Sequence, residues 1–123
     1  MNNSKDPHDE RRQFKRLNRS YILKYFDKSD PTKKFEITQL KNISLGGVCF
    51  PASQELAPQS KLGIELKAPY YADFVYLEGI VLECKEKIED MMYEVRLQFD
   101  ELSPKAEYVL ANMINAMLKG ENT

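Results

Sequence analysis

Residues 93–99 read YEVRLQF, and this stretch gives the clearest indication of the fold. Every second side chain from Tyr93 to Phe99 is apolar, and the side chains between them are polar. Because successive side chains of a strand point to opposite faces of a sheet, this alternation predicts a strand with one face in a core and the other in solvent. The neighbouring segments must then supply the partners of this strand.

The segments that precede residues 93–99 also have the composition of strands. They span residues 21–26, 35–43, 48–50, 61–66 and 74–84, and a charged stretch at 85–90 (KEKIED) is expected to form the last turn. No helical pattern lies between them, which excludes parallel βαβ units. About six antiparallel strands are therefore expected, and such a sheet usually closes into a barrel because closure removes its unpaired edges.

The end of the chain is predicted to form one helix. Ser103 is a suitable N-cap residue, and Pro104 suits the first helical position. Apolar residues then recur three and four positions apart as far as Leu118, and Gly120 is a natural stop. The sequence thus predicts a mainly β fold, in which the apolar stripe of a C-terminal α-helix packs on a six-stranded antiparallel β-barrel.

Composition narrows the function classes. The chain has 123 residues, of which 42% are hydrophobic, and this is enough for the core of one domain. With 18 basic against 19 acidic residues, the net charge of −1 argues against a general nucleic-acid coat or a polybasic membrane binder. No apolar run approaches the ~20 residues that cross a bilayer, and the start is polar. A cytoplasmic protein without membrane insertion is expected.

The residues offer no candidate machinery for catalysis. Nucleophilic catalysis of the Ser-His-Asp or Cys-His type needs a positioned imidazole, and the single histidine is His8, in the polar N-terminal stretch. Cys49 and Cys84 stand apart from each other and are expected to be buried, reduced thiols. A metal site needs three or four converging ligands. We therefore expect no enzyme, no metal and no cofactor.

A basic segment, residues 10–19, is the most informative charge feature, with five basic side chains and one acidic. Arg12 and Arg16 lie four positions apart, and Arg11 precedes them. The planar guanidinium group suits phosphate oxygens and the O6/N7 edge of guanine. Taken alone, two arginines at this spacing are most typical of a solvated basic tail.

A second motif, residues 42–47 (NISLGG), follows the second predicted strand. Asn42 carries a donor and an acceptor, and Ser44 carries a hydroxyl. Gly46 and Gly47 permit positive φ and close approach of the backbone. Such a bend can hold a base edge or an anion, although alone it also has the composition of an ordinary polar turn.

The two motifs together, on an all-β pattern that ends in a helix, resemble the PilZ domain family, the bacterial receptors for cyclic di-GMP. That family is marked by RxxxR near its N-terminal edge and by [D/N]xSxxG after the second strand. Here these motifs are Arg12 with Arg16, and Asn42 with Ser44 and Gly47. The resemblance covers residues 10–118, expected as one domain between a flexible tail at 1–9 and a short tail at 119–123.

The resemblance implies how cyclic di-GMP is bound. Arg12 and Arg16 would contact guanine edges and phosphates, while Asn42, Ser44 and Gly47 would hold one guanine at the barrel surface. Arg11 would either stack on a second nucleotide or remain in solvent. The expected binding residues are Arg11, Arg12, Arg16, Asn42, Ser44, Gly46 and Gly47. Binding is expected to order the basic segment and to change the surface presented to a separate effector protein.

Two other functions remain open. The first is a PilZ-like adaptor that contacts proteins and binds no nucleotide; such members usually lack one or both motifs. The second is a small nucleic-acid-binding barrel, which the aromatic residues among Lys and Arg in residues 14–26 support, since bases stack on aromatic rings. The net charge counts against it, so neither DNA nor RNA is expected as a partner.

Overall fold

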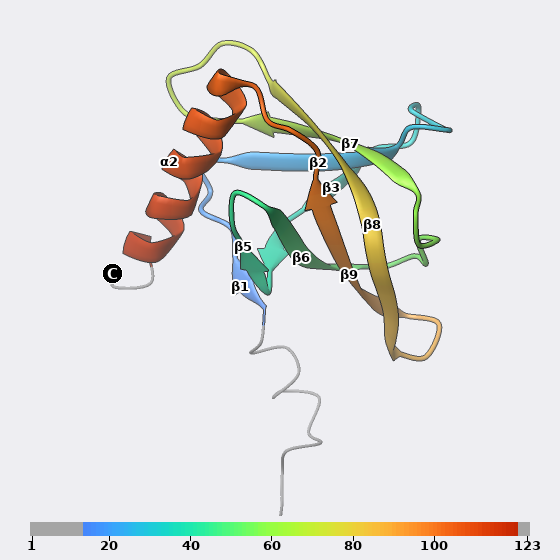
Figure 1. The fold of residues 1–123 in the computed structure, drawn as a ribbon. Helices are drawn as coiled ribbons and strands as arrows, with labels where there is room; N and C mark the ends of the chain where they lie inside the picture. The colour runs from blue at the N-terminus through green and yellow to red at the C-terminus, as the bar shows by residue number, and fades with distance from the viewer. Residues whose placement is uncertain (1–13, 121–123) are drawn as a thin grey trace, which may run out of the picture.

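An antiparallel sheet of seven strands dominates residues 14–120, the part of the chain that the computed structural model describes (Figure 1). The predicted tail at 1–9 lies outside the described residues, as do Arg11 and Arg12. The elements are β1 (Lys15–Arg16), β2 (Ile22–Asp27), β3 (Phe35–Ile37), β4 (Gln39–Leu40), β5 (Asn42–Ile43), β6 (Gly47–Ala52), β7 (Lys61–Lys67), β8 (Val75–Ile88), β9 (Met92–Phe99) and α2 (Pro104–Gly120).

The sheet curls because its two ends belong to one short segment. The strand order is β3-β2-β7-β8-β9-β6-β5, and β3 and β5 are both parts of residues 35–43. Between them, β4 pairs with β1 in a separate two-stranded sheet. The mainly β fold with a C-terminal helix is confirmed. The main sheet has seven strands rather than the expected six, because residues 35–43 change partner twice and so form three short strands instead of one.

The hairpin of β8 and β9 is longer than predicted. The expected turn over residues 85–90 is wrong for most of its length, since β8 continues to Ile88. Lys85 and Glu86 pair with residues of β9, and the chain reverses only at residues 89–91, where Asp90 has a φ of 57°. This end of the hairpin is exposed, so charged side chains are stable there without forming a turn.

The core lies inside the curl and beneath the helix. On β9, Val95 and Leu97 are buried, while Arg96 between them points to solvent, which confirms the predicted alternation. Phe50 of β6 is also fully buried. From α2, Leu110 packs into the same core, and burial of one such side chain stabilises the fold by about 1.5–3 kcal/mol.

The start of α2 is fixed by its predicted cap. The hydroxyl oxygen of Ser103 accepts a hydrogen bond of 3.1 Å from the backbone N–H of Ala106. The far end of the helix packs less tightly, and Leu118 is exposed. Figure 1 shows this end of α2 beside β1 and β5. Within the described part of the chain, no helix combines the length and apolar character that crossing a bilayer requires.

Candidate functional site

The bend, residues 42–47, connects β5 to β6 and is held by its own hydrogen bonds. The backbone N–H of Ser44 donates to the carbonyl of Gly47 at 2.9 Å. The N–H of Gly46 donates to the Ser44 hydroxyl oxygen at 3.1 Å. In this arrangement the hydroxyl acts as an acceptor within the protein, so its own hydrogen is available to a ligand.

The two glycines of the bend have different roles. A Cβ atom on Gly47 would lie 2.2 Å from the carbonyl oxygen of Leu97, so β9 can approach closely only because no side chain is present. A Cβ atom on Gly46 would meet nothing nearer than the Ser44 hydroxyl at 3.7 Å. Neither glycine has a positive φ. Position 47 is therefore glycine because the backbone of β9 approaches closely. The positive φ that the sequence also suggested does not occur at either glycine.

A cavity of about 210 Å³ lies against the bend on the outer side of the sheet. Asn42, Ser44, Gly46 and Gly47 all line it, so the structure brings the four predicted bend residues together. The remaining lining residues come from β6, β8 and β9, and they are Val48, Leu82, Arg96, Leu97 and Gln98. The bend is therefore one wall of a cavity to which β8 and β9, both distant in sequence, also contribute.

Arg96 lines this cavity and was not among the residues predicted for the site. Its Nε and one terminal nitrogen lie 3.4 and 3.3 Å from Oε1 of Glu83 on β8. In the strand register Asn42 lies opposite Cys49, Cys49 opposite Arg96, and Arg96 opposite Glu83. The alternation in residues 93–99 indicated that Arg96 faces outward, but this pattern does not define the strand register that places Arg96 beside the bend.

Glu94, two positions before Arg96 on β9, is the centre of a group of charged side chains beside the bend. Glu94 accepts hydrogen bonds from Lys41 Nζ at 3.1 Å and from the Cys49 thiol at 3.4 Å, and Lys87 Nζ lies 3.7 Å away. Burial alone would raise the pKa of Glu94, but the hydrogen bonds and nearby lysine charges lower it below its ordinary value. Glu94 is thus a carboxylate on β9 that contacts Lys41, between β4 and β5, together with Cys49 of β6 and Lys87 of β8.

The two cysteines are free thiols, Cys49 buried and Cys84 half-buried. Burial, together with the neighbouring negative charge of Glu94, raises the pKa of Cys49 to about 11. The thiolate is the reactive form of cysteine, so Cys49 is an unreactive thiol at neutral pH. Among residues 14–120, no three His, Cys, Asp or Glu side chains lie close enough to hold a metal ion.

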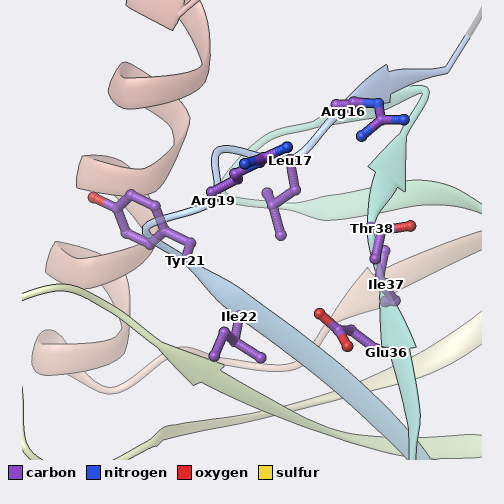
Figure 2. A pocket seen from close by; sticks show the side chains of 8 residues that line it. All are labelled: Arg16, Leu17, Arg19, Tyr21, Ile22, Glu36, Ile37 and Thr38. Atoms are coloured by element: carbon purple, nitrogen blue, oxygen red, sulfur yellow. The ribbon is translucent and has the colours of Figure 1, made fainter.

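Arg16 lies at a different cavity, of about 260 Å³ (Figure 2). It belongs to β1, where it pairs with Gln39 of β4, and its side chain is exposed. The backbone N–H of Leu17 donates to the carbonyl of Thr38 at 2.8 Å, which anchors the segment to the barrel. Figure 2 shows a second guanidinium group, that of Arg19, at the same cavity. Arg19 was counted in the basic segment but not predicted as a site residue.

Arg16 and the bend line different cavities, although the residue that pairs with Arg16 is close to the bend along the chain. Gln39, the partner of Arg16, precedes Asn42 by three positions, while Asn42 and Lys15 both line a third cavity, of about 200 Å³, beside α2. Because neighbouring side chains on a strand point to opposite faces, Lys15 rather than Arg16 lies nearest to the bend. The structure therefore groups the four bend residues at one cavity and places Arg16 at another.

The PilZ domain model matches residues 10–116 of the chain. Among solved structures, the PilZ domain of YcgR from Escherichia coli with c-di-GMP is 14% identical, with a TM-score of 0.60, and the match covers 88% of this chain and 90% of that one. MrkH of K. pneumonia in its apo state is 13% identical, with a TM-score of 0.62 and coverage of 89% and 49%.

The inhibitor of motility MotI/DgrA of Bacillus subtilis is 14% identical, with a TM-score of 0.57 and coverage of 87% and 51%. This chain thus spans about half the length of MotI/DgrA and of MrkH. No curated protein matches the sequence. At these identities the likeness to the solved structures concerns the fold.

Proposed function

The chain belongs to the PilZ domain family, and we propose on this premise that it is a receptor for cyclic di-GMP. The observation that carries the proposal is the cavity at the bend, where the second family motif is assembled on the outer face of the sheet. The related PilZ domain of YcgR, whose structure contains c-di-GMP, supports the choice of ligand. The proposed role is binding, with no chemical step.

In the proposed complex, the bend holds one guanine. Asn42 offers a donor and an acceptor on one amide, and guanine presents both kinds of group along its edges. The Ser44 oxygen accepts one hydrogen bond from the Gly46 N–H, and the hydroxyl hydrogen adds a donor for the ligand. Gly47 brings the backbones of β6 and β9 together, which fixes the cavity before the ligand arrives.

The basic segment supplies the positive charge for the two phosphates. Arg16 is exposed, and among residues 14–120 its side chain has no ion-pair partner, so no ion pair with a residue of this range has to be broken when it binds an anion. Arg11 and Arg12 lie outside the described residues and are proposed as ligand contacts from the family motif. Charge-assisted hydrogen bonds of this kind contribute about 1.5–3 kcal/mol each.

We further propose that binding orders the basic segment and changes the surface that a separate effector protein meets. Hydrogen exchange with and without cyclic di-GMP tests this step. Slower exchange across residues 5–18 in the complex is expected. Equal exchange with saturating nucleotide would show that the segment does not respond to the ligand.

Calorimetric titration is the direct test of the receptor function. Cyclic di-GMP should bind with low-micromolar affinity, about −8 kcal/mol, whereas GTP and GMP serve as controls and should bind far more weakly. The absence of binding by cyclic di-GMP, or equal binding by GMP, would contradict the proposal. A folded protein without nucleotide binding would instead favour the adaptor that contacts proteins alone.

A further inference from the structure

Arg96 occupies a position from which it can reach a base held at the bend. It points outward from β9 between two buried residues and lines the cavity together with Asn42 and Ser44. Asn42 and Arg96 are separated in the sheet by one intervening strand, β6. With strands about 4.8 Å apart, their backbones are roughly 10 Å from each other. A planar base resting against Asn42 therefore comes within reach of the long arginine side chain.

The neighbouring wall suits a base as well. Leu82 of β8 is exposed and lines the same cavity, next to the register shift between Val81 and Glu83. An exposed apolar side chain beside polar groups offers a surface on which the face of a ring can pack, while its edge meets hydrogen-bonding groups. The cavity thus combines an apolar wall with polar groups on two sides.

Glu83 holds the guanidinium group only weakly. Both nitrogen–oxygen distances, 3.3 and 3.4 Å, are long for charge-assisted hydrogen bonds. The two side chains are 57% and 41% exposed, and Glu83 also faces Lys85 Nζ at 3.5 Å. An exposed ion pair of this geometry contributes little to stability. Arg96 can therefore exchange the carboxylate for a ligand without disturbing the fold.

We propose that Arg96 is a further ligand-binding residue that recognises the guanine edge, and that Glu83 competes with the ligand for its guanidinium group. The inference rests on the proposed receptor function and names a specificity determinant of that site. Guanine presents the acceptors O6 and N7 side by side, which match the planar guanidinium group, whereas adenine carries an amino donor in place of O6. Arg96 would thus favour guanine over adenine.

The experiment compares cyclic di-GMP and cyclic di-AMP as calorimetric probes of the full chain. Arg96→Ala should weaken binding of cyclic di-GMP by about tenfold and leave any binding of cyclic di-AMP nearly unchanged, so the preference for guanine falls. Arg96→Lys should recover only part of the loss, because an ammonium group lacks the planar fork. Lys33→Ala, in the exposed turn between β2 and β3, removes one positive charge far from the cavity and serves as the control.

The competition is tested with Glu83→Gln. This variant should bind cyclic di-GMP about threefold more tightly, since the weak internal partner of Arg96 is lost. The gain should disappear in the double variant Arg96→Ala, Glu83→Gln. A gain that persists there would show that Glu83 acts through its general charge and would overturn the competition.

Three outcomes separate this inference from the proposed function. Wild-type binding of cyclic di-GMP with unchanged affinity in Arg96→Ala would overturn the role of Arg96 and leave the receptor function intact. An equal loss of both nucleotides would overturn guanine recognition. Failure of the wild-type protein to bind cyclic di-GMP would overturn the receptor function itself. Circular dichroism of each variant confirms that the fold is retained.

Discussion

The bend and the basic segment are held by different means. The bend is closed by the Ser44–Gly47 and Gly46–Ser44 hydrogen bonds, and the N–H of Phe99 donates to the carbonyl of Gly46 at 2.8 Å. In the basic segment, Arg16 belongs to a strand of two residues, and its side chain is exposed. The base-binding half of the proposed site is thus formed in advance, whereas the phosphate-binding half loses side-chain entropy on binding.

The largest expected effect tests how rigid the bend is. Gly47→Ala places a Cβ atom against the Leu97 carbonyl and must push β6 from β9, which should destabilise the protein by roughly 3 kcal/mol. Urea unfolding measures the change. Gly46→Ala is the matched control, because its Cβ atom makes only an ordinary contact of 3.7 Å with the Ser44 hydroxyl, and it should stay within about 0.5 kcal/mol of the wild type. Equal effects of the two substitutions would contradict the assigned role of Gly47.

The second prediction separates binding from folding. Arg16→Ala should reduce the affinity for cyclic di-GMP at least about tenfold with no change in the unfolding midpoint, because the Arg16 side chain is exposed. Lys33→Ala again controls for the loss of one charge. Calorimetry measures the affinity and urea unfolding measures the midpoint, both on the same preparations. Near wild-type affinity would remove Arg16 from the site.

A smaller effect is expected at Ser44. Ser44→Ala removes the acceptor of the Gly46 N–H, which should lower the free energy of unfolding by about 1 kcal/mol. It also removes the donor offered to a ligand, which should weaken binding by about 1 kcal/mol. Ser44→Thr keeps the hydroxyl and should retain most of both. If Thr behaves like Ala, the hydroxyl is not the group that matters.

These predictions depend on features that the sequence revealed to different degrees. The alternation around Val95 and Leu97 and the cap at Ser103 are local, because a strand face and a helix start are decided by nearby residues. The division of residues 35–43 depends on which strands lie beside each part. The presence of Arg96 and Asn42 at one cavity depends on the register of three strands. No local pattern contains that information.

The smallest expected effect concerns pH. The folded-state pKa of Glu94 is lowered, chiefly by Lys41 and Cys49 against the opposing effect of burial. Its stabilising contribution is therefore complete above the unfolded-state value near 4.5 and is lost as the pH falls through the lower folded-state value. Glu94→Gln should flatten the acid side of the stability curve by about 1 kcal/mol at most, measured by thermal unfolding between pH 3 and 7. An unchanged slope would exclude Glu94 as a source of acid sensitivity.

The segment that contains both β3 and β5 makes the barrel sensitive to where the chain is cut. A break between residues 38 and 41 would place the two ends of the sheet on separate pieces and would open the barrel along its length. A break at residues 89–91 would leave every strand pair in place, because the strands before and after it remain hydrogen-bonded to each other. A nicking protease or a circular permutation would therefore be tolerated at the second position and destructive at the first.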